Sequence, residues 1–89
     1  MAKNITVFNE SESPVSCFIS KYGGGDNSWT EILEHDAEKW GRVQWEVVVF
    51  SFDPKNINAA RAGLYLNLAV PTRIRFHSLD YIDVQPVGE

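Results

Sequence analysis

The residues best suited to chemistry lie in the stretch KYGGGDNSWTE, residues 21–31, where Asp26 and Asn27 precede Trp29. Glycines let a backbone approach a ligand closely, and the carboxylate and amide offer hydrogen-bond partners for hydroxyl groups. The indole adds an apolar face on which a sugar ring can stack. The stretch therefore has the components of a shallow carbohydrate site. It also has the composition of an ordinary turn before a capped element, and both interpretations stay open.

Catalytic and metal-binding patterns are weak elsewhere in the chain. His35, in the run LEHDAE, is typical of a solvated charged turn. The run HSLD, residues 77–80, contains the residue types of a hydrolytic triad, but strand neighbours point to opposite faces and cannot converge. The two histidines and the scattered carboxylates lack a metal-ligand spacing, and residues 26–27 have no second acidic cluster nearby for calcium. We therefore expect no enzyme activity, no metal and no cofactor.

Aromatic residues make up 12% of the chain, with three Trp, three Tyr and five Phe. Trp45, Phe50 and Phe52 belong to an apolar run and are expected in the core. Rings with a polar edge suit ligand sites and interfaces, and several others are less clearly needed for packing. The candidate carbohydrate-binding residues are Asp26, Asn27, Trp29, Trp40, Arg42 and Tyr65.

Composition and charge limit the classes of partner and compartment. A chain of 89 residues, 44% hydrophobic and 22% charged, is typical of one soluble globular domain. The net charge of −4 argues against a nucleic-acid partner, because phosphate binding needs a cationic surface. Cys17 is the one cysteine, so an intrachain disulfide is impossible. The start MAKNITVFNE lacks the apolar run of a secretory signal, and no run approaches the ~18 apolar residues of a membrane span. We expect cytoplasmic residence.

The elements that position these residues are predicted to be strands. The run VSCFI alternates, with Val15, Cys17 and Ile19 on one face. The strongest strand is QWEVVVFSF, residues 44–52, which is apolar on both faces and is therefore predicted to be central and covered on two sides. Short strands separated by turns indicate a β-sandwich or a small barrel. We predict an all-β fold, a single antiparallel β-sandwich of six or seven strands over residues 1–89.

The predicted core follows the alternation of apolar residues along these strands. It comprises Ile5, Val7, Val15, Cys17, Ile19, Val47, Val49, Leu64, Leu66, Ile74, Phe76 and Ile82.

One segment, residues 28–41, carries helical signals instead. Ser28 and Glu31 have the spacing of a capping box, apolar residues recur at helical intervals, and Gly41 stands where a helix would stop. One short helix is therefore possible at residues 29–40. The competing interpretation is a strand WTEIL, a polar turn EHDAEK and a new strand from Trp40. A second short helix or a loop is expected at residues 54–63.

Several runs resemble those of small signal-less fungal β-sandwich proteins, which are lectin-like or cytolysin-like. The resemblance rests on ITVFNESESPVSCFISKY, a glycine-rich loop, W.R...E.VVF, RAGLY and the closing IRFHSLDYI. These are packing motifs, and the short length and single cysteine differ from the larger cytolysins. The resemblance implies a sandwich fold and a lectin-like or defence-related binding role.

The leading hypothesis is a non-enzymatic carbohydrate-binding protein with glycans as partners. The alternatives are a membrane-interacting, cytolysin-like protein and a structural or interaction domain with no small ligand. Surplus rings on so small a chain also predict a homodimer or small oligomer, which would raise the avidity of weak sugar sites.

Overall fold

The computed structural model describes residues 3–22 and 28–87, and within them every regular element is a strand. The eight strands are β1 (Ile5–Asn9), β2 (Val15–Ile19), β3 (Thr30–Ile32), β4 (Ala37–Trp40), β5 (Trp45–Ser51), β6 (Arg61–Asn67), β7 (Thr72–Ser78) and β8 (Tyr81–Pro86). The predicted all-β class is confirmed, with eight strands in place of six or seven.

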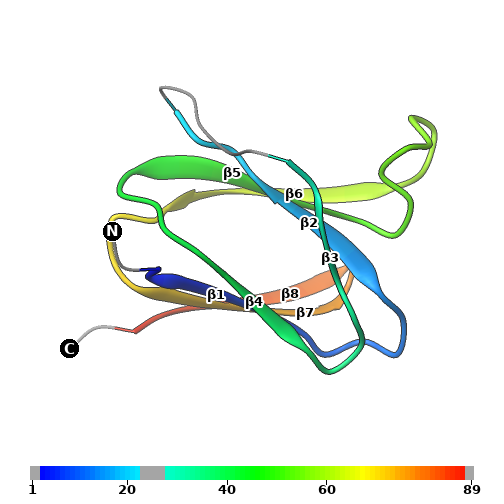
Figure 1. Cartoon of the computed structure of the whole chain (residues 1–89), viewed down its shortest axis with the longest axis horizontal. Coiled ribbons are helices and arrows are strands. Elements are labelled where there is room, and N and C mark those ends of the chain that lie inside the picture. The colour runs from blue at the N-terminus through cyan, green and yellow to red at the C-terminus, as the bar shows by residue number, and fades with distance from the viewer. Residues whose placement is uncertain (1–2, 23–27, 88–89) are drawn as a thin grey trace.

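The strands form two packed sheets of four, which Figure 1 shows as separate layers. One sheet has the order β4-β1-β7-β8 and is called the β1 sheet; the other has the order β3-β2-β5-β6 and is called the β5 sheet. Neighbouring strands are antiparallel except for β1 and β7, which are parallel. The architecture is a small β-sandwich, and consecutive strands repeatedly pass from one sheet to the other.

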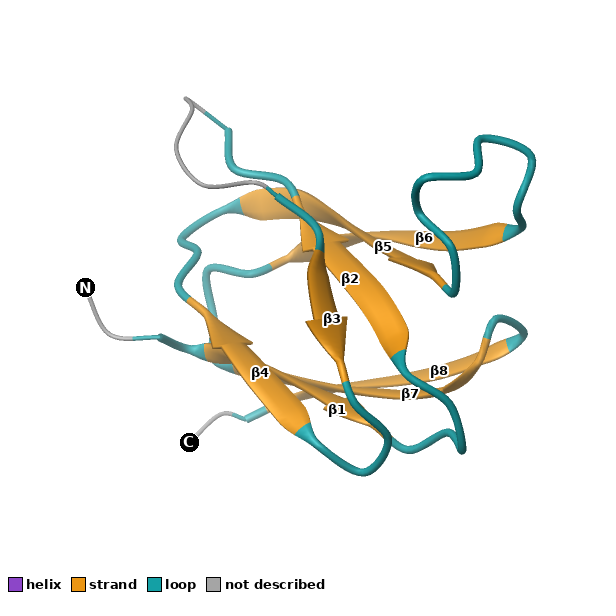
Figure 2. Cartoon of the chain, turned by 45° about the vertical axis from the view of Figure 1, so that its right-hand side comes forward, coloured by secondary structure: helices purple, strands orange, loops and turns teal. Residues whose placement is uncertain are grey.

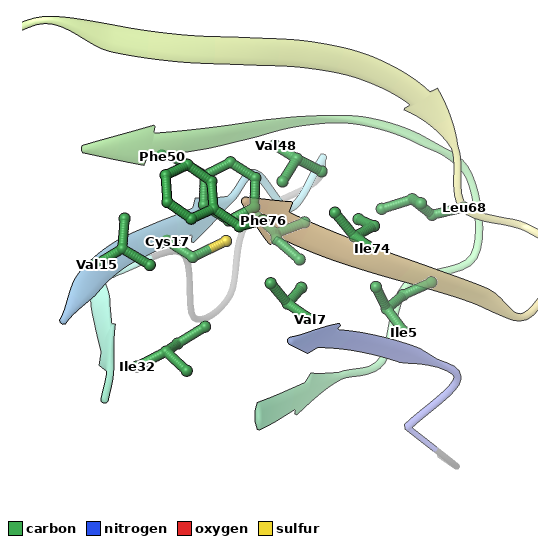
Figure 3. Packing of buried hydrophobic residues seen from close by; sticks show 11 residues of the cluster. Ile5, Val7, Val15, Cys17, Ile32, Val48, Phe50, Leu68, Ile74 and Phe76 are labelled. Atoms are coloured by element: carbon green, nitrogen blue, oxygen red, sulfur yellow. The ribbon is translucent and has the colours of Figure 1, made fainter. Parts of the chain in front are cut away.

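The core fills the space between the sheets, mainly with alternate residues of β1, β2, β5 and β7 (Figure 3). At its centre the rings of Phe50 and Phe76 stack with centroids 4.7 Å apart. Burying a side chain of this size contributes about 1.5–3 kcal/mol to stability. The full set of buried apolar residues is Ile5, Val7, Val15, Cys17, Ile19, Ile32, Val48, Phe50, Leu68, Ile74 and Phe76.

Strand β5 corrects the predicted core. Val48 and Phe50 point inward, whereas the residues that alternate with them lie on the outer face of the β5 sheet. β5 is central within its sheet, between β2 and β6, but the other sheet covers only one of its faces. Because this strand is apolar on both faces, its pattern does not say which face turns inward. The residues of this strand wrongly placed in the core are Trp45, Val47 and Val49. Phe52, just after the strand, was also expected in the core; its ring packs edge-on against Phe76 at a centroid distance of 5.6 Å, but 47% of the residue is exposed.

β6 and β8 are less deeply buried than predicted. Both are edge strands that close the same side of the sandwich. Leu66 and Ile82 pack against the core but remain partly accessible, and Leu64 is half-buried.

Residues 29–40 form strand, turn and strand, so the short helix possible there is wrong. β3 pairs with β2, with Val15 opposite Ile32, and β4 pairs with β1, with Ile5 opposite Trp40. The chain thus crosses between the sheets at residues 33–36, and Figure 2 shows β3 and β4 on the same side of the molecule. The backbone hydrogen bonds of β3 to β2 and of β4 to β1 stabilise this segment more than its capping-box spacing and helical apolar periodicity would stabilise a helix. Residues 54–60 likewise form turns, without a helix.

The side chain of Asn9 holds this crossing in place. It is fully buried, and its Nδ2 donates to the carbonyls of Ser13 at 2.8 Å and Ile32 at 2.9 Å. Its Oδ1 accepts from the backbone N–H of Ser11 at 3.0 Å. The Asn9 carbonyl accepts the His35 N–H at 2.8 Å, where His35 has a φ of 61°. These bonds fix where β3 ends and β4 begins.

Candidate functional sites

The six predicted carbohydrate-binding residues do not meet at one place among the described residues. Two of them, Asp26 and Asn27, lie outside the part of the chain that the structure describes. The other four lie at three places: Tyr65 on β6 beside Trp45, Trp29 in a cluster with Phe18 and Arg61, and Trp40 together with Arg42 at a pocket.

The first surface is the outer face of the β5 sheet. The rings of Trp45 and Tyr65 lie with centroids 5.1 Å apart and planes tilted by 34°. Both side chains are open to solvent, with 51% of Trp45 and 65% of Tyr65 exposed. Strand pairing places Val47 opposite Tyr65 and Asn67 opposite Trp45. We call these four residues the aromatic face.

Asn67 gives the aromatic face a polar end. Its Oδ1 accepts the backbone N–H of Ala69 at 3.0 Å, which anchors the side-chain amide. The NH₂ group of the same amide is a hydrogen-bond donor suited to a hydroxyl oxygen. Two rings and one anchored amide thus lie within two paired strands.

Trp29 lies elsewhere on the β5 sheet and is already engaged. Its ring contacts Phe18 at a centroid distance of 5.6 Å, and the guanidinium carbon of Arg61 lies 5.4 Å from its centroid. Arg61 also donates to the carbonyl of Pro54 at 2.9 Å, which ties the 54–60 loop to this cluster. A cation–π contact at such a site contributes about 0.5–1 kcal/mol. The Trp29 ring is therefore half-buried packing rather than an open platform.

The second surface is a pocket of about 260 Å³ between the edge strands β3 and β4, which we call the Trp40 pocket. Trp40 forms part of its wall while also packing against the core. The complete lining is Lys3, Thr30, Glu38, Lys39, Trp40, Gly41 and Arg42. One tryptophan and several polar or charged residues therefore line this pocket.

Arg42 forms a fixed part of this pocket. Only 6% of the residue is exposed. Its Nε donates to the Ser20 carbonyl at 2.9 Å, and its two terminal nitrogens donate to Gly41 at 2.8 Å and Ile19 at 3.0 Å. The sequence suggested a ligand-binding role, whereas these bonds join the end of β2 to the segment before β5. Arg42 thus stabilises the pocket's shape.

The residues that the sequence interpretation missed are Trp45 on the aromatic face and the polar lining of the Trp40 pocket. Trp45 was assigned to the core because it belongs to the apolar run of β5. Glu46, its neighbour, is buried at the inner side and accepts from Ser20 Oγ at 2.7 Å and the Tyr22 N–H at 3.1 Å. Strand neighbours alternate, so the inward Glu46 goes with an outward Trp45. Sequence reasoning expects a carboxylate on the outer face, which would turn Trp45 inward, so the sequence held no signal that could have placed Trp45 correctly.

Groups that often mark enzymes are placed as follows. The ring of His77 stacks on Tyr81 with centroids 4.5 Å apart. Cys17 is buried, and this burial raises the pKa of its thiol.

Within residues 3–22 and 28–87, no cluster of three or more His, Cys, Asp or Glu side chains is arranged to hold a metal ion. The same residues include no helix of the length and apolarity needed to cross a membrane.

No protein-family model matches the chain, and neither a curated protein nor a solved structure does.

Proposed function

We propose that the protein is a non-enzymatic carbohydrate-binding protein that uses the aromatic face as its platform. The observation that supports this most strongly is the Trp45–Tyr65 pair, two adjacent rings that are each more than half exposed on a sheet surface. Exposed rings of this size are costly to hydrate and are favoured where one side of a contact is dry and the other wet.

The chemistry of the aromatic face fits a sugar better than a wholly apolar ligand. A pyranose presents C–H groups on one side, which pack on indole and phenol rings, and hydroxyls around its rim. The anchored amide of Asn67 lies at the rim of the ring pair and provides a donor for such a hydroxyl. The Tyr65 hydroxyl adds a second polar group beside the rings. Open platforms of this kind bind weakly, so multivalent glycans are the expected targets.

Substitution of the two rings tests the proposal directly. The wild-type chain is screened on a broad glycan array, and the best oligosaccharide is then titrated by calorimetry. Trp45→Ala and Tyr65→Ala each remove half of the platform and are expected to weaken binding by at least tenfold, or about 1.4 kcal/mol. Tyr81→Ala is the matched control, because Tyr81 is 59% exposed but lies in the β1 sheet.

Two results would contradict the proposal. One is the absence of binding across the array by protein shown to be folded. The other is equal loss of affinity in Tyr81→Ala and Trp45→Ala. Trp and Tyr also suit a lipid headgroup region, so the same rings could bind a membrane instead of a sugar. Co-sedimentation with vesicles that contain no glycolipid tests this membrane-interacting alternative. Pelleting with such vesicles that depends on Trp45 and Tyr65 would replace sugar binding by lipid binding.

A further inference from the structure

We infer that the free edge of β6 is a docking site for an extended peptide segment of a partner protein. The peptide adds a strand to the β5 sheet and places one large apolar side chain in a pocket beside the edge. This site is separate from the proposed sugar platform, because it uses the backbone of β6 rather than the rings of the aromatic face.

The strand register shows which backbone groups of β6 are available. The Leu68 N–H donates to the Gln44 carbonyl at 3.1 Å, in the same register as the β5–β6 pairs. Hydrogen-bonded pairs alternate along an antiparallel ladder, so the even-numbered residues of β6 bond to β5. The odd-numbered residues direct their N–H and C=O groups towards the free edge, where no further strand of the sheet lies. They are Arg61, Gly63, Tyr65 and Asn67.

This edge lacks the features that keep other strands from pairing. β6 is seven residues long and contains no proline. Its one charged residue is Arg61, whose guanidinium carbon lies 5.4 Å from the Trp29 ring centroid and therefore over the face of the sheet. A long edge without charge or proline is a template for another strand.

The other three edge strands are protected. β3 has only three residues, and β4 has four, of which Glu38 and Lys39 are charged. In β8, the bond from the Val87 N–H to the Pro71 carbonyl continues the register of the β7–β8 pairs. Pro86 is therefore one of the residues on the free edge of β8, and it has no N–H to donate.

An apolar pocket of about 210 Å³ lies between β6 and β8, the two edge strands on this side of the sandwich. The hydroxyl of Thr72 in its wall donates to the Val70 carbonyl at 2.9 Å and is thus already engaged. The pocket therefore suits an apolar side chain. Its complete lining is Leu66, Asn67, Val70, Thr72, Val84 and Pro86.

The pocket favours a peptide over a second copy of β6. Residues opposite each other in paired strands share a face, so a residue opposite Leu66 points inward, beside the pocket. In the two-fold β6–β6 pairing that uses the whole strand, Leu64 lies at the centre and Ala62 of the second copy lies opposite Leu66. A methyl group leaves most of this pocket unfilled, whereas the side chain of phenylalanine or leucine fills it.

The outer face of β6 sets the other side chains of the peptide. The Tyr65 ring favours a small residue opposite it. A Cβ added at Gly63 would meet its nearest neighbours only at 3.9 Å, so the space there accepts a β-branched residue. The expected segment thus has a large apolar residue opposite Leu66, a small one opposite Tyr65 and a β-branched one opposite Gly63.

The probe is the capped peptide acetyl-Thr-Phe-Ser-Val-Thr-Val-Thr-Lys-amide, which in antiparallel pairing sets its phenylalanine opposite Leu66. We expect saturable binding by calorimetry. In nitrogen–proton correlation spectra, hydrogen exchange of the Gly63 and Tyr65 amides is expected to slow, because these amides donate to the added strand. The amides of Ile82 and Val84, on the free edge of β8, should exchange at unchanged rates.

Variants of the peptide test the two kinds of contact. N-methylation of the serine opposite Tyr65 removes a donor to β6 and is expected to weaken binding at least about tenfold. N-methylation of the valine opposite Leu64 is the matched control, because its N–H faces away from β6. Replacing the phenylalanine by alanine empties the pocket and should likewise weaken binding at least about tenfold.

Variants of the protein test the pocket itself. Val70→Asp places a charge in the apolar lining and is expected to weaken binding at least about tenfold. Val43→Asp is the matched control, because both valines are exposed, at 44% for Val70 and 59% for Val43, and only Val70 lines the pocket. Trp45→Ala should bind the peptide like the wild type, although it is expected to lose the sugar.

The following outcomes would overturn the inference. They are the absence of peptide binding to folded protein, slowed exchange at β8 instead of β6, equal affinity of the two N-methylated peptides, or equal affinity of Val70→Asp and Val43→Asp. Slowed exchange of Gly63 and Tyr65 in the protein alone, lost on dilution, would assign the edge to a second copy. None of these results bears on sugar binding, which is read from the glycan array.

Discussion

At the scale of single residues, Cys17 shows how surroundings determine chemistry. It lies in β2 opposite Phe50 and is fully buried among apolar side chains. Desolvation disfavours the thiolate, so burial raises the pKa of this thiol well above its ordinary value of 9.0. The reactive form of a cysteine is the thiolate, and Cys17 is therefore inert in the folded protein.

Cys17 should make stability depend on pH in alkaline solution. Above pH 9.0, the ordinary thiol pKa, the unfolded chain loses the proton that the folded chain keeps, so unfolding releases a proton. The free energy of unfolding should then fall with rising pH, by up to ~1.4 kcal/mol per pH unit from this group. Urea titrations of wild type and Cys17→Ala at several alkaline pH values measure the slope. An equal slope in both proteins would contradict this assignment.

The residues that could be predicted best lie in strands with one polar face. Ile5, Val15, Cys17 and Ile74 were assigned to the core, and all four are buried. In these strands, polar or charged residues alternate with the apolar ones. The apolar face must therefore turn inward, because burying the polar residues would cost free energy.

At the scale of the element, β5 shows why the candidate site was only partly predictable. The apolar residues of β5 occupy both of its faces. If the strand is displaced by one residue along its partners, the residues that faced the core face the solvent instead, and those that faced the solvent face the core. That exchange moved Trp45 and Val47 from the predicted core to the aromatic face. Tyr65 was judged less clearly required for packing, because the leucines on either side of it share one face of the strand, and it is 65% exposed.

The β3–β4 crossing was open to two interpretations because its local signals and its pairing partners disagree. Glu31 has the spacing of a capping box with Ser28, yet it lies in β3 opposite Ser16. Strand partners far apart in sequence cannot be identified from one sequence, and they decide this element. The Trp40 pocket depends on this crossing and was therefore beyond prediction, although Trp40 and Arg42 were named.

His35 provides a test of the turn at the crossing. Its φ of 61° lies in the left-handed region, where a β-branched side chain is most strained. His35→Val is expected to lower the free energy of unfolding by about 1–2 kcal/mol relative to His35→Gly, measured by urea denaturation. Both variants lose the exposed contact between His35 Nε2 and Glu12 at 3.3 Å, so it cancels in the comparison.

Glu12→Gln removes that contact alone, and an exposed contact of this kind is worth only about 0–1 kcal/mol. Equal stability of the valine and glycine variants at position 35 would show that the turn relaxes without strain.

At the scale of the whole molecule, the two outer faces of the sandwich differ. The β1 sheet exposes charged side chains such as Arg75, whose Nε lies 3.6 Å from a Glu10 carboxylate oxygen and whose guanidinium covers the Phe8 ring at 5.0 Å. The β5 sheet exposes Trp45, Val47 and Tyr65 without a comparable cation over them among the described residues. Contiguous apolar surface of this kind is commonly an interaction site.

This asymmetry leads to a prediction about self-association. In the absence of ligand, two copies are expected to pair weakly through the aromatic face, because pairing removes the exposed rings from water. The patch is small compared with the ~800 Å² per partner of a stable interface, so the dimer should dissociate on dilution. Light scattering should give a mass that falls towards the 10.1 kDa of one chain as concentration decreases.

The same surface cannot hold a second copy and a sugar together, so the two events should compete. Saturating oligosaccharide and Trp45→Ala are each expected to bring the mass to that of the monomer at micromolar protein concentration, whereas Tyr81→Ala should associate like the wild type. A dimer that persists unchanged in Trp45→Ala would place the interface elsewhere. A mass of 10.1 kDa at every concentration of wild type would mean that the aromatic face stays open to solvent and available to a glycan without prior dissociation.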